Sequence, residues 1–407
     1  MSDVMKGFRV LEVAEHTFVP AASAVLADWG ADVVKVEHVT RGDAMRGLGR
    51  TGALNLGGQV HVLYEHSNRG KRSIGLDLGN EQGLEVLHAL IKTSDVFLTN
   101  KTPAVTRKLK LGVDDIRAHN PKIIYVRGSA YGPKGPESES GGYDMTGYWC
   151  RGGSAMGATP PNVDGCINQP GPAYGDSIGA MTIAGGIAAA LLRRERTGEP
   201  SVVDVSLLGT GVWAMGAAIA LSMQLGQAWR PPPLGGVAAI GNPLVSVYRT
   251  KDERFINFTM LQAFKYWADF CKHIERPELA SDPRFDSHEN LSANASEAQA
   301  IIREVIATRT LAEWRDTFVT LKGQWAPIQD SLELTTDPQV RANGYLTGAA
   351  TSDGISFELA ASPVQFDERP TETRRGPEFN EHGDEILQEL GIDWDRIIAL
   401  KAAGAVA

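Results

Sequence analysis

Short β-type runs alternate with helical runs in the first third of the chain, and this alternation limits the possible folds more than any other feature. We expect strands at residues 8–14, 32–37, 72–78, 95–98 and 122–129. We expect helices between them at 21–30, 81–93, 105–111 and 113–119. Strands that alternate with helices of this length form a parallel sheet covered on both faces and joined by right-handed crossovers. The sequence therefore predicts an α/β, doubly wound domain.

Ligands of a doubly wound sheet lie beyond the carboxyl ends of its strands. We expect those ends at 14–20, 37–46, 100–103 and 128–132. The segment after the first strand, Ala-Glu-His-Thr-Phe-Val-Pro-Ala, contains no glycine, and neither GxxxxGKS nor GxxxxGKT occurs in the chain. The missing glycine fingerprint argues against a nicotinamide dehydrogenase.

Composition excludes further classes of protein. The 407 residues suffice for two or three domains, and the net charge of −9 argues against a nucleic-acid partner. Three widely spaced cysteines without metal-ligand spacing predict reduced thiols, no metal site and a cytoplasmic protein. The first residues lack the layout of a signal peptide, and the longest apolar stretches contain glycine, so we expect no membrane partner.

The composition changes after a proline-rich segment at 227–236, which favours a stiff extended linker. A β-hairpin is expected at 244–249 and 254–260, and amphipathic helices follow at 264–274, 296–309 and 311–321. This part predicts a separate α+β unit. Further segments outside it are expected as a functional loop at 128–174, a strand at 201–208, one helix at 209–225, strands at 354–359 and 364–366, and a helix pair at 384–406.

Asp176 lies in Gly-Pro-Ala-Tyr-Gly-Asp-Ser-Ile-Gly at 171–179, just before an apolar helix expected at 178–196. The commoner role for such an aspartate is an N-cap, because its side chain accepts from an unpaired backbone N–H. The second role is a nucleophile. Gly175 would bring a bare N–H close to a docked group, and the helix dipole would keep the carboxylate ionised. These residues alone leave both roles open.

Several short motifs occur in a specific order. They are Gly-Ala-Asp-Val-Val-Lys-Val-Glu at 30–37, Gly42-Asp43 with Arg46, Asn-Arg-Gly-Lys-Arg-Ser-Ile at 68–74 with Leu76-Asp77, Asn100, Gly175-Asp176-Ser177, Asp-Pro-Arg-Phe at 282–285, and Gly-Asp-Glu-Ile-Leu at 383–387 with Leu390-Gly391. The ordered set resembles the class III coenzyme A transferases of the CaiB–BaiF family, whose relatives include formyl-CoA transferase and α-methylacyl-CoA racemase. The resemblance covers nearly the whole chain.

This resemblance implies a Rossmann-like large domain built from residues 1–225 and 343–407. It also implies a smaller α+β domain with its linkers at 226–342, and an interlocked homodimer. An acyl-CoA and a carboxylic acid are the implied substrates, coenzyme A lies on the large domain, and no cofactor is bound permanently. The family's catalytic aspartate falls on Asp176.

The implied reaction is covalent catalysis by Asp176. Its carboxylate attacks the thioester carbonyl to form an anhydride, the released thiolate converts the anhydride to an aspartyl-CoA thioester, and the acceptor acid then displaces coenzyme A. Each tetrahedral intermediate needs N–H donors at its oxyanion. The glycines near Asp176 and the Gly235-Gly236 pair are candidates for that role.

Basic residues near strand ends are candidates for the phosphates of coenzyme A. Lys71, Arg72 and Lys108 are favoured, with Arg69, Lys101 and Arg107 as further candidates, whereas the alternative for all of them is a solvated charged surface. The complete predicted set of coenzyme A contacts is Glu15, His16, His38, Arg46, Lys71, Arg72, Asn100, Lys101 and Lys108. Related transferases often have arginine where this chain has His38, and some have histidine or arginine at the position of Glu15.

Tyr143 separates the two enzyme branches. A racemase needs two bases flanking the α-carbon, and its histidine position is occupied here by Tyr143 in Gly141-Gly-Tyr-Asp-Met145. A tyrosine with an ordinary pKa of about 10 is a poor proton shuttle at neutral pH. We therefore predict a transferase with Tyr143 as its second catalytic-site residue, a donor or wall in the acyl pocket. An α-methylacyl-CoA racemase is the alternative. A non-enzymatic coenzyme A-binding protein is disfavoured because the Gly-Asp-Ser context is intact.

Overall fold

The computed structural model describes residues 3–48, 50–51, 54–55, 58–234 and 241–407. The chain forms two compact units. The first unit comprises residues 1–157, 167–229 and 338–407, and the second comprises 158–166 and 230–337. The division expected from the family resemblance, at residues 225 and 342, stays a prediction.

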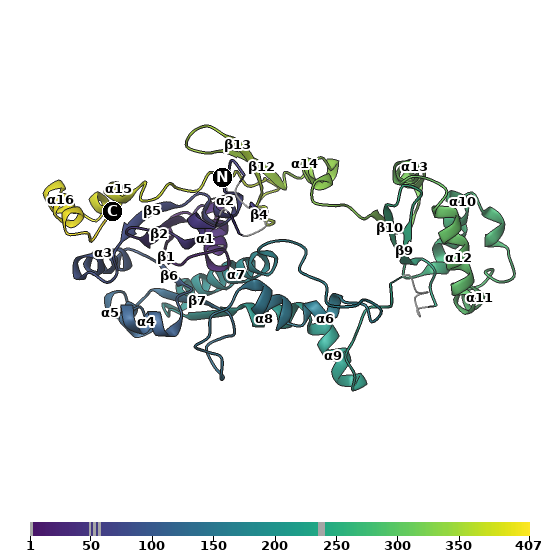
Figure 1. The fold of residues 1–407 in the computed structure, drawn as a ribbon, viewed down its shortest axis with the longest axis horizontal. Helices are drawn as coiled ribbons and strands as arrows, with labels where there is room; N and C mark the ends of the chain where they lie inside the picture. The colour runs from purple at the N-terminus through teal and green to yellow at the C-terminus, as the bar shows by residue number, and fades with distance from the viewer. Residues whose placement is uncertain (1–2, 49, 52–53, 56–57, 235–240) are drawn as a thin grey trace. The chain divides into compact units, whose positions relative to one another are not determined.

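A six-stranded parallel sheet is the centre of the first unit (Figure 1). Its strand order is β5-β2-β1-β6-β7-β8, and every neighbouring pair is parallel. The strands are β1 (Arg9–Val13), β2 (Asp32–His38), β5 (Arg72–Leu76), β6 (Val96–Thr99), β7 (Ile124–Ser129) and β8 (Val202–Ser206). The predicted parallel α/β sheet is confirmed. The strand order reverses direction between β1 and β6, and this is where ligands of such sheets bind.

Alternate residues along each strand belong to opposite faces of the sheet. In β6, Val96 and Leu98 belong to one buried cluster and Phe97 to the other. The first cluster joins the sheet to α1 (Phe18–Asp28) and α7 (Tyr174–Thr197). The second cluster joins it to α3 (Glu81–Lys92), α5 (Val113–His119), α15 (Gly383–Glu389) and α16 (Trp394–Ala402). Helices therefore cover both faces, as the alternation predicts.

Helix α7 packs along α1 and reaches β7 and β8. Ile183, Ala184 and Ile187 are fully buried on it. The helix is long and apolar enough to cross a membrane by length and composition alone. Its place in the core of the first unit accounts for that composition, because a core helix needs the same small apolar residues.

Three expectations outside the sheet need correction. The helix expected at 209–225 is two helices, α8 (Leu207–Ala214) and α9 (Gly216–Leu225), bent by 64° at the break between them. The loop expected at 128–174 contains a π-helical turn at Met145–Cys150 and α6 (Ser154–Ala158).

The strand expected at 364–366 does not form. Instead β12 (Leu346–Ala350) pairs antiparallel with β13 (Ser356–Ala360), and Phe366 makes an isolated bridge to Arg369. The turn between β12 and β13 contains Gly354 at φ 88°, a conformation that glycine adopts easily, and this turn sets the pairing. The remaining elements of the unit are a 3₁₀ turn at Ala44–Gly47, β3 (Arg50–Thr51), β4 (Leu54–Asn55), α2 (Val62–Asn68), α4 (Pro103–Leu109) and α14 (Pro338–Ala342).

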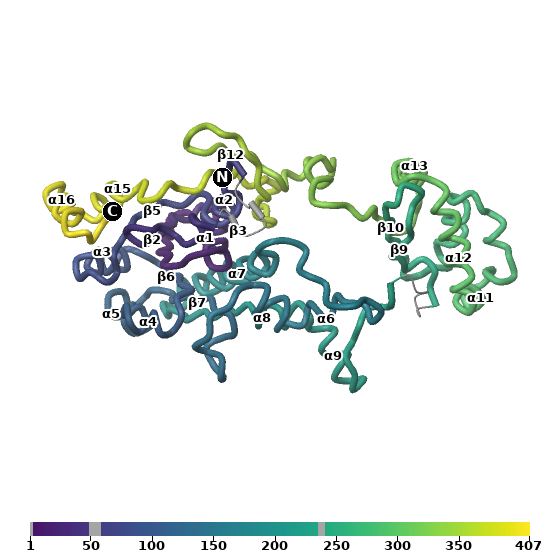
Figure 2. Tube along the Cα trace, viewed as in Figure 1, coloured from purple at the N-terminus to yellow at the C-terminus, as the bar shows by residue number. Residues whose placement is uncertain are grey.

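The second unit has its own sheet and its own core. Figure 2 shows its chain trace in green. Its strands β9 (Val245–Arg249), β10 (Phe255–Thr259) and β11 (Trp325–Pro327) are antiparallel in the order β11-β10-β9. Its helices are α10 (Ala263–His273), α11 (His288–Ala293), α12 (Ala295–Ile306) and α13 (Leu311–Thr317), with 3₁₀ turns at Pro277–Ala280, Phe318–Thr320 and Glu333–Thr335. The predicted hairpin and amphipathic helices are confirmed. The three-residue strand β11 is too short to show a pattern in the sequence.

Candidate active site

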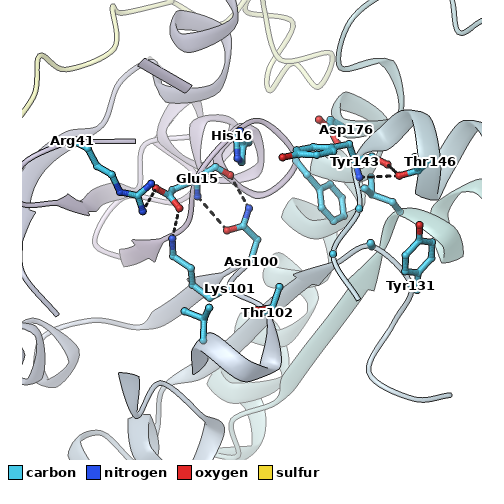
Figure 3. Close-up of a pocket in the computed structure, with 16 residues that line it drawn as sticks. Glu15, His16, Arg41, Asn100, Lys101, Thr102, Tyr131, Tyr143, Thr146 and Asp176 are labelled. Carbon is cyan, nitrogen blue, oxygen red and sulfur yellow. Dashed lines mark hydrogen bonds and ion pairs between the residues drawn. The ribbon is translucent and has the colours of Figure 1, made fainter. Parts of the chain in front are cut away.

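A cavity of about 660 Å³ lies at the carboxyl ends of β1, β6 and β7 (Figure 3). It occupies the point where the strand order reverses, as expected for a ligand site of a doubly wound sheet. The first residues after each of these strands reach it. Its lining consists of Glu15, His16, Phe18, Arg41, Asn100, Lys101, Thr102, Val105, Ala130, Tyr131, Gly141, Gly142, Tyr143, Thr146, Asp176 and Leu207.

Asp176 is the third residue of α7, so its side chain reaches the cavity from the first helical turn. The N-cap is Ala173, at φ 57°, and the N-cap interpretation of Asp176 is therefore wrong. A glycine at position 175 is needed for packing, because a Cβ there would lie 2.4 Å from Cγ of Tyr148. Gly175 is helical, so the sharp turn expected there does not form, and its close approach to a docked group stays a prediction.

Burial raises the pKa of Asp176 to about 7, and the nearby Asp144 carboxylate adds to the rise. The prediction that the helix dipole keeps Asp176 ionised needs correction. A helix dipole contributes roughly 0.3–1 kcal/mol, whereas a rise of about three pKa units corresponds to about 4 kcal/mol. Burial therefore outweighs the dipole, and the pKa of Asp176 lies near neutral pH.

Tyr143 lies on the same wall as Asp176, and its ring meets His16 edge-on with 5.6 Å between the ring centroids. The Tyr143 backbone N–H donates to Oγ1 of Thr146 at 3.0 Å, which fixes this part of the wall. Asp144 is buried and accepts a hydrogen bond from Nε2 of Gln169 at 3.2 Å. Sequence reasoning missed Asp144, although it follows Tyr143 directly in the motif.

Glu15 and Lys101 form a close ion pair in the cavity, and Nη2 of Arg41 lies 3.2 Å from Oε1 of Glu15 (Figure 3). Asn100 holds the backbone of Glu15 on both sides. Its Oδ1 accepts from the Glu15 N–H at 3.2 Å, and its Nδ2 donates to the Glu15 carbonyl at 2.7 Å. Arg41 was missed from the sequence, although it lies within the strand end expected at 37–46.

A second cavity of about 280 Å³ lies beside the first, at the ends of β2 and β5. Glu15, Arg41, Lys101 and Val105 line both cavities. His38 and Lys108 line only the second. The structure thus brings six of the predicted coenzyme A contacts to two adjoining cavities, namely Glu15, His16, His38, Asn100, Lys101 and Lys108.

The structure does not bring Lys71 and Arg72 to these cavities. Both residues come before or at the start of β5, and in a parallel sheet this is the edge opposite the ligand. Lys71 is buried, and its Nζ donates to Glu12, to the Pro20 carbonyl and to Asn68. Arg72 is paired with Asp32 and Glu389. The phosphate role predicted for Lys71 and Arg72 is therefore withdrawn.

Arg46 lines neither of the two cavities, because its side chain has partners within the protein. Its Nε and Nη2 donate to both carboxylate oxygens of Glu37 at 2.7 Å, and its guanidinium lies over the Tyr64 ring. Arg69 forms a buried pair with Asp28, and Arg107 pairs with Glu139 at the surface. These side chains have protein partners in place of a ligand. The predicted oxyanion donors Gly235 and Gly236 lie outside the described residues.

The fold and the cavity define an α/β protein with a carboxylate and a cation cluster at the ligand edge of a parallel sheet. The model of the CoA-transferase family III matches residues 5–383, and the chain belongs to this family. The protein is a family III CoA-transferase.

Relatives across the whole chain agree with this assignment. The cinnamoyl-CoA:phenyllactate CoA-transferase of Clostridium sporogenes is 30% identical over 98% of this chain and 96% of its own length. The (R)-2-hydroxy-4-methylpentanoate CoA-transferase of Clostridioides difficile is 28% identical over 99% of both chains. The crystal structure of a CaiB/BaiF family protein from Brucella suis has the same fold, with a TM-score of 0.78 over 96% of this chain and 100% of that chain at 24% identity.

Proposed function

We propose that the protein transfers coenzyme A from an acyl-CoA to a carboxylic acid through covalent intermediates on Asp176. The observation that carries this proposal is the place of Asp176 on the cavity wall. Two carboxylates line the cavity, and Glu15 is neutralised by Lys101. Among the described residues, Asp176 has no cation within ion-pair distance, and its carboxylate is therefore available for bond formation.

The reaction proceeds by exchange at the Asp176 carboxyl group. Its ionised oxygen forms a bond to the thioester carbon while the carbon–sulfur bond breaks and the CoA thiolate leaves. The thiolate then attacks the aspartyl carbonyl of the anhydride, and the donor carboxylate leaves. The acceptor carboxylate attacks the aspartyl-CoA thioester, forms a second anhydride and releases the CoA thiolate. The thiolate then attacks the acceptor acyl carbon, which gives the new acyl-CoA and releases the Asp176 carboxylate. Each step exchanges one nucleophile for one leaving group, and no cofactor is required.

Coenzyme A is proposed to bind at the Rossmann-like edge of the sheet, across the two adjoining cavities. Lys101 and Arg41 line both cavities and Lys108 lines the second, so these cations can meet the phosphate groups. The thioester then lies towards Asp176. Tyr143 is proposed as a wall of the acyl pocket, where its ring meets His16.

The racemase alternative is not favoured. The two relatives described above are named as CoA-transferases, and Tyr143 replaces the histidine that the racemase mechanism needs. Incubating the protein with a 2-methylacyl-CoA in deuterated water tests this choice. We expect no α-proton exchange without an acceptor acid, and rapid exchange would restore the racemase assignment.

An interlocked homodimer in the cytoplasm, with no nucleic-acid or membrane partner, is proposed as the working form. Helix α9 buries no residue, and Met223 on it is 75% exposed while Trp213 before it is 84% exposed. Apolar side chains at this density are typical of a surface that a second subunit covers. Light scattering at low micromolar concentration is expected to give the mass of two chains, and a monomer would refute the assembly.

The decisive experiment is the variant Asp176→Asn. Asparagine preserves the shape of the side chain but cannot form the anhydride, so we expect a folded protein with transfer activity reduced by at least about 10³-fold. Wild-type kcat/KM is expected to rise with pH through about 7, since only the ionised Asp176 attacks.

A trapping experiment identifies the covalent residue. The wild-type enzyme is incubated with an acyl-CoA, treated with hydroxylamine or borohydride, and mapped by mass spectrometry of its peptides. We expect the modification in the peptide that contains Asp176 and none in Asp176→Asn. A modified residue elsewhere, or an active Asp176→Asn enzyme, would end the mechanism.

A further inference from the structure

Glu15, Arg41 and Lys101 form a cluster between the two cavities, which we name the Glu15 clamp. All three residues line both cavities. A ligand that extends from one cavity into the other must therefore pass these side chains. A carboxylate is an unexpected neighbour for cations at such a point, because it neutralises the charge that would attract a phosphate.

The two halves of the Glu15 carboxylate are held differently. Oε2 accepts a hydrogen bond from Nζ of Lys101. Oε1 is buried and makes no hydrogen bond within the described part of the chain, although Nη2 of Arg41 lies 3.2 Å away. The Arg41 side chain is 56% exposed, whereas those of Glu15 and Lys101 are 18% and 20% exposed. The Arg41 half of the clamp is thus a charge contact without an aligned hydrogen bond, and it is easily exchanged.

Asn100 fixes the backbone of Glu15 through both of its amide groups. The backbone therefore stays in place when the side chain changes partner. Rotation about the side-chain bonds of Glu15 alone can release Lys101 and Arg41. The Glu15 carboxylate can therefore change position while the hydrogen bonds between Asn100 and the Glu15 backbone remain.

We propose that the Glu15 carboxylate occupies the place of a coenzyme A phosphate in the empty protein and competes with it for Lys101 and Arg41. This inference rests on the proposed binding of coenzyme A across the two cavities. A phosphate offers more acceptor oxygens than one carboxylate and makes strong charge-assisted bonds to Lys and Arg, so it displaces Glu15. Glu15 thereby weakens the binding of coenzyme A and shields the two cations from other anions.

The test compares coenzyme A with pantetheine, which lacks the phosphates, in calorimetric binding experiments on the full-length protein. Glu15→Gln removes the competing charge and preserves the side-chain size. We expect it to tighten the binding of coenzyme A by about three- to ten-fold and to leave pantetheine binding unchanged. The matched control is Glu199→Gln, which makes the same charge change in an exposed pair with Arg193 and should leave both affinities unchanged.

A double-mutant cycle distinguishes competition from a general charge effect. The gain from Glu15→Gln should disappear in the Lys101→Ala background, because the freed cation is then absent. If Glu15→Gln weakens coenzyme A or leaves its affinity unchanged while Lys101→Ala weakens it, the competition is refuted and the binding site stands. If Lys101→Ala also has no effect on coenzyme A, the proposed placement of coenzyme A fails as well.

Discussion

Two clusters of acidic and basic residues begin three positions apart on the chain, at Glu12 and at Glu15, yet the structure uses them differently. Glu12 lies inside β1 and is completely buried. Its carboxylate contacts Nζ of Lys35 and Nζ of Lys71, each at 2.7 Å, and Lys35 also lies 2.6 Å from Asp43. We name Glu12, Lys35, Asp43 and Lys71 the buried cluster. The Glu15 clamp lies just beyond the strand, at the cavity.

The two clusters differ in how closely opposite charges compensate for burial. In the buried cluster, burial alone would raise the pKa of Glu12, but Lys35 and Lys71 outweigh burial and lower it. For Lys35, burial would lower the pKa, and Asp43 with Glu12 outweighs it and raises the pKa above its usual range. Each charge in the buried cluster has an opposite charge within 2.7 Å, although burial outweighs these neighbours for Lys71 and lowers its pKa to about 7. In the clamp, Oε1 of Glu15 makes no hydrogen bond within the described residues, and its Arg41 partner is more than half exposed.

The position of a lysine relative to the strand end decides its role in this protein. The buried cluster still supports the cavity, because Asp43 accepts from the His16 N–H at 3.0 Å. It contributes by holding the loop and offers no free charge. Lysine side chains of equal formal charge therefore act as structure in one place and as ligand contacts in the other.

The largest expected effect comes from removing the central cation of the buried cluster. Lys35→Ala leaves the Glu12 and Asp43 carboxylates buried with Lys71 as the remaining lysine. Breaking a buried ion pair by removing one partner costs about 3–5 kcal/mol, so we expect a loss of that size in the free energy of unfolding. Urea unfolding followed by circular dichroism measures it. A loss below about 1 kcal/mol would show that the buried cluster is not the tightly balanced network described above.

Lys71→Ala separates structure from ligand binding. We expect it to lower the free energy of unfolding by about 3 kcal/mol, because Glu12 and Asn68 lose a buried partner. Coenzyme A affinity of the folded variant should not change, since Lys71 lies away from both cavities. Calorimetric titration at a temperature where the variant is folded checks this. A clear loss of coenzyme A affinity with normal stability would show that Lys71 binds the ligand and would restore its predicted phosphate role.

Asp176→Asn should stabilise the protein at alkaline pH. The folded pKa of Asp176, at about 7, lies above its unfolded value of about 3.9, so the folded state holds the proton more tightly. Wild-type stability from this group is present below the unfolded pKa and is lost as pH rises to about 7. We expect Asp176→Asn to be more stable than the wild type by about 4 kcal/mol at pH 8, with little difference at pH 4. An equal difference at both pH values, measured by urea unfolding, would contradict the raised pKa.

Lys101→Ala is expected to have the smallest effect of the four variants. It should weaken coenzyme A binding and leave stability nearly unchanged, whereas Lys71→Ala should do the reverse. Coenzyme A affinity should fall about ten-fold, equivalent to about 1.4 kcal/mol, through the loss of one phosphate contact. The free energy of unfolding should change by less than about 1 kcal/mol, because Lys101 and Glu15 form a partly exposed pair. Titration and urea unfolding on the same preparation measure both quantities. A large loss of stability would place Lys101 with the buried cluster.

The sequence predicted the sheet and the hairpin correctly because their evidence is local. Alternating periodicity from 8 to 129 marks strands and helices without knowledge of their partners. Turn and helix-end residues such as Gly198 after α7 act within a few positions, and the structure ends the helix there. The break between α8 and α9 escaped detection, because small apolar residues continue through it and no proline or charge marks the bend.

The candidate site could be predicted only in part. Glu15, Asn100 and Lys101 follow strands and Asp176 lies in the first turn of a helix, and the order of elements along the chain brings such positions to one edge of a parallel sheet. Tyr143 was predicted from the family resemblance. Lys71 and Arg72 precede a strand, and their motif gave no sign that acids from other elements would enclose them. Asp144 and Arg41 adjoin predicted residues, but their contacts depend on Gln169 and Glu15, which are distant in sequence.

The sequence by itself determined the strands of the parallel sheet, their order along the chain and therefore the edge of the sheet that holds the cavity. Tertiary structure alone decided which charges are matched in the interior and which face a ligand. The physical reason is that strand and helix propensities act between neighbours along the chain, whereas burial and ion pairing act between residues brought together by folding. Glu12 meets Lys71 across 59 positions, and that contact, invisible in the sequence, makes one lysine structural and leaves Lys101 at the cavity.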